Sequence, residues 1–423
     1  MTEAPVLAPQ RYVWPREGNC RVPYWVYSDL AVYEREQERI FRGPTWNYVA
    51  LDAQLPKPGD FKTTFVGDTP VIVTRDLKGA VHIMVNKCAH RGATVCRSQS
   101  GNAKGFTCIY HQWNYDLAGR LTGVPFRSGV ADGDRRVGGM PPDFSLADHG
   151  LMPLHAESCN GVVFASFDPP MPPVREYLGE AMLYYFERVF DGRPLRMLGT
   201  LRQTIRANWK LIFENIKDPY HATLLHVFLV SFGLFRADQR SKVEMDPTGR
   251  HAVLVSRRGE QKASAGTADM SKFKADYSLH DPTLLASRRE FKDENTVVMQ
   301  TIFPNLIVQQ QTNTLAMRQI VPLGPHHFDL VWDFFGYADD DEELTRIRLR
   351  QANLMGPAGL VSVDDTEAME MCQRSLGAPG RDAALLEMGG RECRNEDHMV
   401  TETAIRGFYQ YYRQIMAFDT EAV

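Results

Sequence analysis

Two short segments of the chain each carry a cysteine and a histidine at a spacing that suits a metal centre. The first reads Cys88-Ala-His90, and the second reads Cys108-Ile-Tyr-His111. Two such pairs at two tight turns can converge on a zinc ion held by two sulfurs and two nitrogens. They can also hold a two-iron cluster, in which two cysteines bind one iron and two histidines bind the other. Zinc sites usually begin with two cysteines about two to four residues apart, so the Cys-x-His spacing favours the iron cluster.

A second candidate metal site lies between Asn208 and Phe228, in the segment NWKLIFENIKDPYHATLLHVF. His221 and His226 are candidate iron ligands, because a ferrous site that activates O₂ typically uses two histidines and one carboxylate and leaves other positions open. Residues five apart on a regular helix point about 140° away from each other. We therefore expect the helix to be distorted between the two histidines, or one histidine to lie beyond its regular part.

The stretches around these residues predict the elements that must position them. Residues 1–26 are rich in Pro, Arg and aromatic residues and are expected to form an extended arm, followed by a helix from Ser28 to Gly43. From about Thr45 to Asp168, short β-rich runs separated by Gly, Pro and Asp predict a small antiparallel β domain. The proline-rich segment FDPPMPPVREYL then predicts a linker.

Beyond the linker, helical and strand-like stretches are mixed, and residues 259–292 are polar and irregular, as expected of a mobile loop. The pattern predicts an all-β module near the front of an α+β domain. Helices are predicted around 175–190, 219–235, 341–355, 364–376 and 401–418, and strands at 198–206, 251–257, 297–303, 306–321 and 328–337.

Composition limits the class of protein. The 423 residues carry 48 Lys and Arg against 52 Asp and Glu, a net charge of −4, which excludes nucleic-acid binding by bulk electrostatics. No apolar run approaches the ~20 residues needed to cross a bilayer, and the N-terminus has neither the basic nor the apolar region of a signal peptide. Seven scattered cysteines, an odd number, favour a reducing compartment. We therefore expect a cytoplasmic enzyme that binds neither nucleic acid nor membranes.

The segments CAHRG at 88–92 and CIYHQWNYDLAGRLTG at 108–123 resemble the Rieske motif of the large subunits of ring-hydroxylating oxygenases. The family's second box more often reads C-P-Y-H-G-W, and Ile109 and Gln112 depart from it at positions that are not ligands. The departure is therefore expected to affect the shape of the loop and not the cluster. The resemblance implies a [2Fe–2S] cluster held by Cys88, His90, Cys108 and His111.

The segment ENIKDPYHATLLH resembles the iron-binding box of the same family. The resemblance implies that His221 and His226 bind a mononuclear Fe(II). It makes Asp218 the aspartate that bridges the iron site of one subunit to a Rieske histidine of its neighbour. Asp218 also precedes Pro219, so it is expected to cap a helix N-terminus as well. Asn215 falls at the family's iron-proximal asparagine position.

The third iron ligand is expected far away in sequence. The stretch GPAGLVSVDDTEAMEMC at 356–372 resembles the family's segment, in which the second aspartate of the pair is the ligand, here Asp365. Adjacent residues on a helix differ by ~100°, so only one of Asp364 and Asp365 can face the metal, and Asp364 is the alternative. Both aspartates also suit the start of a helix.

Arg318 lies in the strand-like run LIVQQQTNTLAMRQIV among apolar or neutral residues. A buried arginine must pair with an anion. A substrate carboxylate is one candidate, because it matches the guanidinium in a two-pronged geometry. A salt bridge inside the protein is the other.

The resemblance covers nearly the whole chain and implies an α+β fold. It places an N-terminal arm and helix at residues 1–44, an antiparallel β Rieske domain at 45–170, and a START-like helix-grip catalytic domain with the mononuclear iron at 171–423. It further implies a trimeric ring of large subunits with a small β subunit (α3β3), and electrons that come from NADH through a reductase and a ferredoxin.

The implied activity is hydroxylation of a small aromatic acid with O₂. An ortho-substituted benzoate is favoured, with anthranilate converted to catechol by an anthranilate 1,2-dioxygenase first and 5-hydroxylation of salicylate second; ortho-halobenzoate and terephthalate are further candidates in this branch. Two other classes stay open: a Rieske electron carrier, which would need only the first domain, and a zinc-stabilised binding protein with a START-like cavity.

Overall fold

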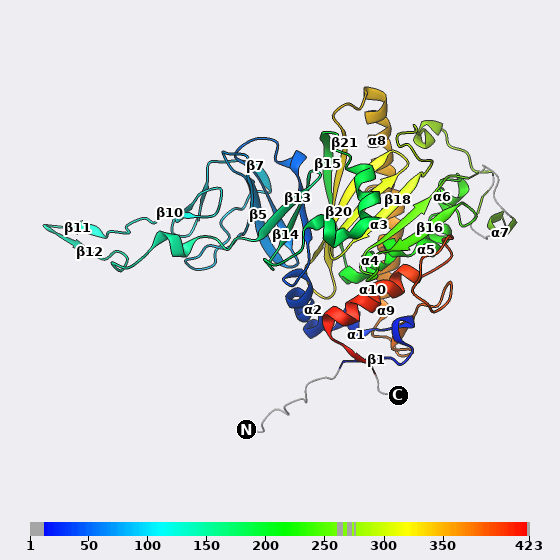
Figure 1. The fold of residues 1–423 in the computed structure, drawn as a ribbon, viewed down its shortest axis with the longest axis horizontal. Helices are drawn as coiled ribbons and strands as arrows, with labels where there is room; N and C mark the ends of the chain where they lie inside the picture. The colour runs from blue at the N-terminus through cyan, green and yellow to red at the C-terminus, as the bar shows by residue number, and fades with distance from the viewer. Residues whose placement is uncertain (1–11, 260–264, 269–272, 275, 421–423) are drawn as a thin grey trace, which may run out of the picture.

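The computed structural model describes residues 12–259, 265–268, 273–274 and 276–420, which form an elongated molecule of two parts (Figure 1). A narrow β domain extends to one side of a broader C-terminal domain of helices and sheet. Among the described strands, every pair except β1 with β23 is antiparallel. The predicted α+β class, with an antiparallel β module ahead of a mixed domain, is therefore confirmed.

Small antiparallel sheets make up the β domain. A four-stranded sheet, in the order β6-β5-β4-β7, and a three-stranded sheet, β13-β14-β3, share one apolar core. A second three-stranded sheet, β10-β9-β8, flanks the turn that follows Cys108, and the hairpin β11–β12 projects from the far end (Figure 1). The strands are β3 (Asn47–Leu51), β4 (Asp60–Val66), β5 (Thr69–Arg75), β6 (Val81–Val85), β7 (Ser100–Asn102), β8 (Phe106–Thr107), β9 (Asn114–Tyr115), β10 (Leu121–Gly123), β11 (Val130–Asp132), β12 (Arg135–Val137), β13 (His155–Cys159) and β14 (Val162–Ser166).

A seven-stranded antiparallel sheet, in the order β15-β21-β20-β19-β18-β17-β16, forms the centre of the C-terminal domain. Its inner strands β20 and β21 are buried along their whole length, because helices cover both faces. Helix α3 packs on one face, and α4 and α10 pack on the other. The strands are β15 (Leu195–Ile205), β16 (Ser241–Met245), β17 (Ala252–Ser256), β18 (Val297–Ile302), β19 (Leu306–Gln311), β20 (Thr314–Pro322) and β21 (Phe328–Tyr337).

The helices lie mostly where the sequence predicts them. The N-terminal helix is split into α1 and α2 and ends in a π-helical turn at Phe41. The helices are α1 (Trp25–Ser28), α2 (Leu30–Glu36), α3 (Val174–Val189), α4 (Trp209–Lys217), α5 (Pro219–Leu225), α6 (Val227–Ser231), α7 (Ala265–Ala268), α8 (Glu342–Met355), α9 (Leu360–Ser375) and α10 (Thr403–Met416).

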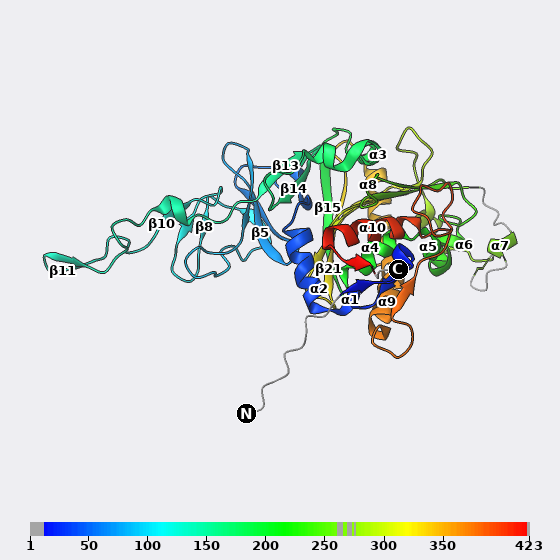
Figure 2. The ribbon, with the colours of Figure 1, turned by 60° about the horizontal axis from the view of Figure 1, so that its bottom comes forward.

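The N-terminal segment belongs in space to the C-terminal domain. Strand β1 (Val13–Trp14) pairs with β23 (Asp419–Thr420), and β2 (Arg21–Pro23) pairs with β22 (Ala383–Leu385). Figure 2 shows α1 and α2 beside α10 and α9, far from the tip of the β domain. The described part of the predicted arm therefore packs on the C-terminal domain through two short strand pairs. Residues 1–11 lie outside the described residues.

Several features differ from the predicted elements, and one of them is helix α4, which was not predicted. The single strand predicted at 306–321 is a hairpin, because Thr312 takes a left-handed φ of 52° and turns the chain between β19 and β20. Strand β16 was not predicted. The predicted loop at 259–292 contains only α7 and a short 3-10 turn at Pro282–Leu285, and its residues 260–264, 269–272 and 275 lie outside the described residues.

A buried carboxylate joins the two domains. Asp333 on β21 is fully buried and accepts hydrogen bonds from the hydroxyl of Tyr48 (3.1 Å) and the amide of Gln54 (2.8 Å). The Lys62 ammonium lies 3.2 Å from the same carboxylate. Because these three partners come from the β domain, Asp333 fixes that domain against strand β21 of the central sheet.

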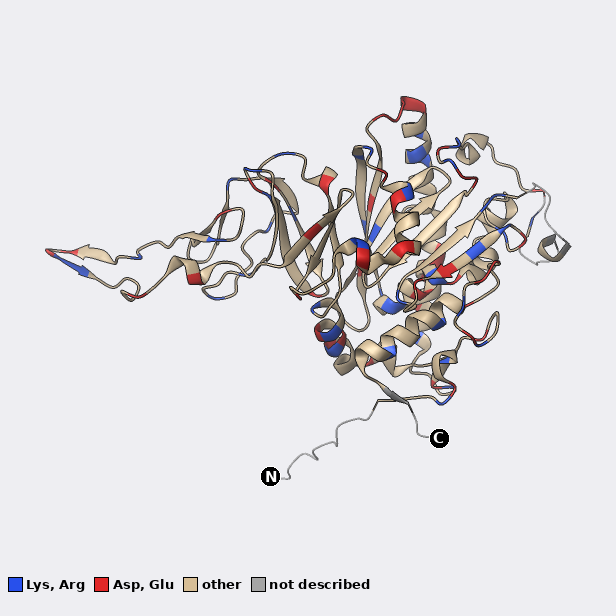
Figure 3. Ribbon diagram, in the orientation of Figure 1, with Lys and Arg blue, Asp and Glu red and all other residues tan. Residues whose placement is uncertain are grey.

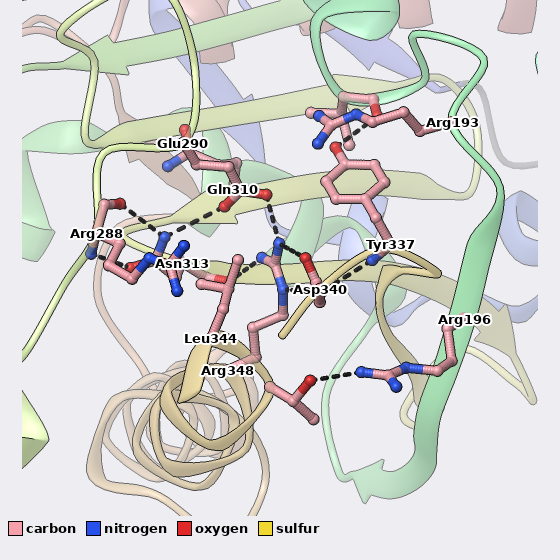
Figure 4. Close-up of polar contacts among 12 residues, drawn as sticks. Arg193, Arg196, Arg288, Glu290, Gln310, Asn313, Tyr337, Asp340, Leu344 and Arg348 are labelled. Carbon is pink, nitrogen blue, oxygen red and sulfur yellow. Dashed lines mark hydrogen bonds and ion pairs between the residues drawn. The ribbon is translucent and has the colours of Figure 1, made fainter. Parts of the chain in front are cut away.

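A second buried network holds the β19–β20 turn in place (Figure 4). Arg348 on α8 donates to the Asp340 carboxylate at 2.7 Å and to the backbone carbonyl of Asn313 at 2.6 Å, and it pairs with Glu290. The side chain of Asn313 donates in turn to the carbonyl of Arg288 at 2.9 Å. This network ties the end of the long loop and helix α8 to the turn.

Charged residues are interspersed over both domains and do not gather on one face (Figure 3). Among the described residues, no helix is both long and apolar enough to cross a membrane.

Candidate active site and metal centres

Two tight turns in the β domain present the first Cys/His set. In each turn, the backbone N–H four positions after the cysteine donates to the cysteine carbonyl at 2.9 Å, from Gly92 to Cys88 and from Gln112 to Cys108. Gly92 and Gln112 both have left-handed φ angles, 74° and 54°. Gln112 therefore adopts a backbone conformation that suits glycine. Its departure from the family box affects the backbone of the turn, and the same turn shape recurs in both loops.

The side chains of the two turns face one another. The Nδ1 atoms of His90 and His111 lie 3.1 Å apart, close enough to share one metal ion. Cys88 and Cys108 are buried in the same apolar cluster. The Tyr115 hydroxyl lies 3.2 Å from the Cys88 sulfur, and contacts of this kind tune the potential of an iron–sulfur cluster. The donor set, two buried thiols and two imidazoles that face each other, fits a Rieske-type [2Fe–2S] cluster.

A second set of donors comes from helices α4, α5 and α9 of the C-terminal domain. His221, His226 and Asp365 offer ligand atoms that all lie within 4.8 Å of one another. The Asp365 Oδ1 atom lies 3.3 Å from His221 Nε2 and 3.2 Å from His226 Nε2. Asn215 completes the group, since its Nδ2 lies 3.1 Å from both Asp365 Oδ1 and His221 Nε2. We refer to His221, His226 and Asp365 as the triad.

A break in the helix brings the two histidines together. Helix α5 ends at Leu225, and His226 has φ −85° and ψ 76°, outside the helical region. Helix α6 starts directly after it. This is the second of the two predicted arrangements, in which one histidine lies beyond the regular helix. The centres of the His221 and His226 rings are 5.6 Å apart.

Helix geometry also separates the paired aspartates of α9. Asp365 points inward, with 8% of its side chain exposed, whereas 36% of the Asp364 side chain is exposed. Asp364 instead lies 3.4 Å from Nδ1 of His226, on the side of the ring away from Asp365. On the other histidine, Asp218 takes the equivalent place, 3.4 Å from Nδ1 of His221. A carboxylate behind each imidazole is the usual way to orient a metal-binding histidine.

Asp218 also caps helix α5, as the sequence predicts. Its Oδ1 accepts from the backbone N–H groups of Tyr220 at 2.9 Å and His221 at 3.2 Å. One oxygen of the carboxylate is thus committed to the cap, and the other is turned toward the His221 ring.

The electrostatics of the triad favour a bound cation. Burial opposes a charge on His221, but hydrogen bonds to Asp218 and Asp365 outweigh it and raise the pKa of His221 to about 10. Burial acts against ionisation of Asp365 too, yet its contacts with His221 and His226 hold its pKa well below the usual range. His221 holds its proton strongly because the carboxylates of Asp218 and Asp365 make the site negative. Two imidazoles and a carboxylate on one face, with this charge, fit a divalent iron ion.

A pocket opens beside the triad, and Arg318 lies in its wall. Arg318 is 4% exposed, and its guanidinium lies 4.0 Å from the ring centre of Trp332. Its described hydrogen bonds all go to the side-chain oxygen of Gln309. Burial lowers the pKa of Arg318 to about 9, against the attraction of Asp365. Of the residues that the structure describes, none offers Arg318 a carboxylate within ion-pair distance. The other lining residues are Asn215, Ile216, Asp218, Ala222, Leu229, Phe235, Leu254, Val297, Met299, Gln311 and Val361, together with the triad.

Sequence reasoning missed Gln309 and Gln311 as parts of this wall. Both are buried on β19, and the register of β19 with β20 places them on the same face as Arg318. The run of three glutamines in an otherwise apolar strand is the signal that could have indicated them.

Comparisons with known proteins cover both centres. Residues 185–418 match the family described as "Ring hydroxylating alpha subunit (catalytic domain)", and residues 45–132 match the Rieske [2Fe–2S] domain. The large oxygenase component of salicylate 5-hydroxylase from Ralstonia sp. is 49% identical over 410 residues, 96% of this chain and 97% of that protein. The large subunit of anthranilate 1,2-dioxygenase from Burkholderia cepacia is 45% identical over 408 residues, 96% and 95% of the two chains. The structure of naphthalene 1,2-dioxygenase with indole bound shares the fold, with a TM-score of 0.76 at 23% identity over 95% and 93% of the two chains.

Proposed function

The chain belongs to the alpha (large) subunits of the Rieske-type ring-hydroxylating oxygenases, and from this premise we propose that it hydroxylates an ortho-substituted benzoate. Its cofactors are a Rieske [2Fe–2S] cluster and a mononuclear iron, and its electrons come from NADH through a partner reductase. The protein is thus an oxidoreductase and one component of a multicomponent system.

We assign the cluster to the two turns of the β domain and the iron to the triad. When bound, the iron supplies the activation of O₂ that ring hydroxylation needs, and the cluster supplies electrons one at a time. The assigned cluster ligands are Cys88, His90, Cys108 and His111, and the assigned iron ligands are His221, His226 and Asp365.

Arg318 is the observation that carries the choice of an aromatic acid. Its guanidinium is buried in the pocket wall and has no acidic partner among the described residues. A buried charge without a partner is costly, and a substrate carboxylate would supply that partner in two-pronged geometry. The apolar lining keeps water from the reacting ring. Because Arg318 and the triad line the same pocket, an acid anchored at Arg318 has its ring in the pocket that contains the triad.

Asp218 has a second proposed role between subunits. One of its oxygens caps α5, and the other faces His221. We assign to this carboxylate the link between the iron site of one subunit and His90 or His111 of the neighbouring copy. The assignment requires a ring of alpha subunits, for which we propose an α3β3 assembly with a small β subunit and a ferredoxin as the electron donor.

The test is product formation by the purified oxygenase with reductase, ferredoxin and NADH. Anthranilate, salicylate, 2-chlorobenzoate and terephthalate are compared with the neutral benzamide and naphthalene. We expect hydroxylated products from ortho-substituted acids and little from the neutral compounds. Turnover of naphthalene but of no acid would refute the proposal. Iron and acid-labile sulfide are measured on the same samples: sulfide excludes a zinc protein, and iron beyond the cluster excludes a simple electron carrier.

Both anthranilate and salicylate satisfy a carboxylate anchor at Arg318. Sequence identity does not separate them, because this chain is 45% identical to the anthranilate 1,2-dioxygenase subunit and 49% identical to the salicylate 5-hydroxylase component. The choice between the two depends on the hydrogen-bonding groups that the pocket offers to the ortho substituent.

A further inference from the structure

Three polar side chains project from one face of the central sheet at the pocket wall. Gln309 and Gln311 are two residues apart on β19, and Arg318 lies on the neighbouring strand β20 opposite Ile307, so the pairing places all three side chains on the same face. Gln311 and Arg318 line the pocket, whereas Gln309 is fully buried and does not line it. The hydrogen bonds among these three side chains determine what the wall offers to a ligand.

Arg318 fixes the orientation of both amides. A guanidinium can only donate, and Nε and Nη2 of Arg318 both donate to Gln309 Oε1, with Nε at 2.7 Å. With its oxygen so placed, Gln309 donates through Nε2 to Gln311 Oε1 at 2.9 Å. The acceptor of Gln311 is therefore occupied. The Nε2 of Gln311 forms no hydrogen bond with any residue in the described part of the chain, and Gln311, which is 7% exposed, lines the pocket.

We infer that Gln311 selects the ortho substituent of the substrate: it presents N–H donors, so the pocket favours an aromatic acid whose ortho group is an acceptor oxygen, as in 2-hydroxybenzoate (salicylate), over 2-aminobenzoate (anthranilate). The inference rests on the proposed function, because it takes the carboxylate of the substrate to lie at Arg318. It reverses the order of the two acids that the sequence alone favours.

The chemistry of the two acids explains the preference. In each, the ortho group donates a hydrogen bond to the neighbouring carboxylate oxygen. A hydroxyl has a single hydrogen, so the oxygen of salicylate turns its lone pairs outward and can accept from Gln311. The amine of anthranilate keeps a second N–H, which points outward at the N–H of Gln311. Two donors that face each other in a buried wall stay unpaired, and an unpaired buried group lowers affinity.

The backbone that carries Gln311 is held firmly. The residues after it, Thr312 and Asn313, donate to the side-chain oxygen of Gln351 at 2.6 and 2.8 Å. Arg348 also donates to the backbone carbonyl of Asn313 at 2.6 Å (Figure 4). The turn therefore cannot shift easily to offer anthranilate a different group.

Calorimetric titration of the cluster- and iron-loaded enzyme without NADH tests the inference. Benzoate, salicylate and anthranilate are compared in the wild type, in Gln311→Leu and in a matched control, Gln99→Leu, at an exposed glutamine of the β domain. We expect the wild type to bind salicylate roughly three- to tenfold more tightly than anthranilate, the range that one neutral hydrogen bond spans. Gln311→Leu should remove this ratio and leave the affinity for benzoate within about twofold, and Gln99→Leu should change neither.

Other outcomes separate the possible failures. Equal binding of the two acids by the wild type, or tighter binding of anthranilate, overturns the inference even if Gln311→Leu fails to fold. An equal loss for benzoate and salicylate in Gln311→Leu also overturns it, because Gln311 would then hold the carboxylate. If the wild type binds none of the three acids, the proposed function fails as well, since Arg318 would not be a carboxylate site.

Discussion

Replacement of Arg318 by glutamine tests the carboxylate anchor. Glutamine keeps a polar side chain that can still reach Gln309, but it removes the charge and the fork of donors. The wall of the pocket should otherwise persist, because Arg318 bonds only to Gln309 among the described residues and stacks on Trp332. The change therefore acts mainly on a bound anion.

Two opposite effects follow from the burial of the guanidinium. Its pKa falls from 12.5 to about 9, so the folded pocket disfavours the charge by an amount on the order of 5 kcal/mol. A substrate carboxylate offsets part of this cost through hydrogen bonds worth about 1.5–3 kcal/mol. We expect Arg318→Gln to raise the dissociation constant of benzoate-type acids roughly tenfold to a hundredfold. The thermal midpoint of the ligand-free protein should be unchanged or higher.

Thermal unfolding with and without ligand measures both effects. A ligand that binds only the folded protein raises its midpoint, so benzoate should protect the wild type more than Arg318→Gln. Benzamide, which lacks the charge, should lose much less on the same substitution. Arg318→Lys should rescue binding in part, since an ammonium cannot reproduce the fork. Arg202→Gln is the matched control, because Arg202 lies in the same domain outside the pocket and pairs with Asp329.

Equal losses for benzoate and benzamide, together with a lower thermal midpoint, would show that Arg318 supports packing. The choice of an aromatic acid would then depend on similarity to relatives alone. An unchanged benzoate affinity in a stable Arg318→Gln protein would place the carboxylate elsewhere in the pocket.

Further predictions test the two centres and the fold. Asp218→Asn keeps the cap of α5 but should lower product formation more than about tenfold while the cluster stays reducible and the iron stays bound; near-normal turnover would leave Asp218 only as a cap. His111→Ala should abolish or strongly shift the Rieske electron paramagnetic resonance signal, and an unchanged signal in folded protein would exclude His111 as a ligand. Gln112→Gly should stabilise the β domain by about 1 kcal/mol in urea unfolding, since the left-handed φ of 54° then costs less. Burial raises the pKa of Glu214 to about 7 from 4.5, so about 3 kcal/mol of stability present below pH 4.5 should be lost as the pH rises to 7; Glu214→Gln should flatten this part of the pH–stability curve.

Periodicity predicts the local geometry of the second metal site, whereas the resemblance to the family indicates which of its residues bind the iron. Because residues five apart diverge on a helix, the pair His221 and His226 requires a break, and the structure has it at His226. The same reasoning requires Asp364 and Asp365 to face different ways, as they do. Local geometry of this kind depends on few residues, so a single sequence is enough to predict it.

Features that depend on long-range pairing could not be predicted. The strand expected at 306–321 is a hairpin, because strand-forming residues on both sides hid the turn at Thr312 and Asn313. If the turn is not recognised, the pairing of β19 with β20 cannot be predicted. The placement of Gln309 and Arg318 on the same face of the sheet then cannot be predicted either. The contacts of Asp333 across the domain junction likewise join residues about 270 to 285 positions apart.

The polar wall of the pocket shows how stability and specificity oppose each other here. An apolar strand would complete the sheet face more cheaply than Gln309, Gln311 and Arg318, which leave a charge without an acidic partner and an amide without an acceptor in the described structure. Buried polar groups are costly unless they are paired. The two groups that remain unsatisfied both open on the pocket that contains the triad. A ligand that carries an anion and an adjacent acceptor oxygen would satisfy both at once, and an aromatic ring joining those two groups also suits the apolar lining between them.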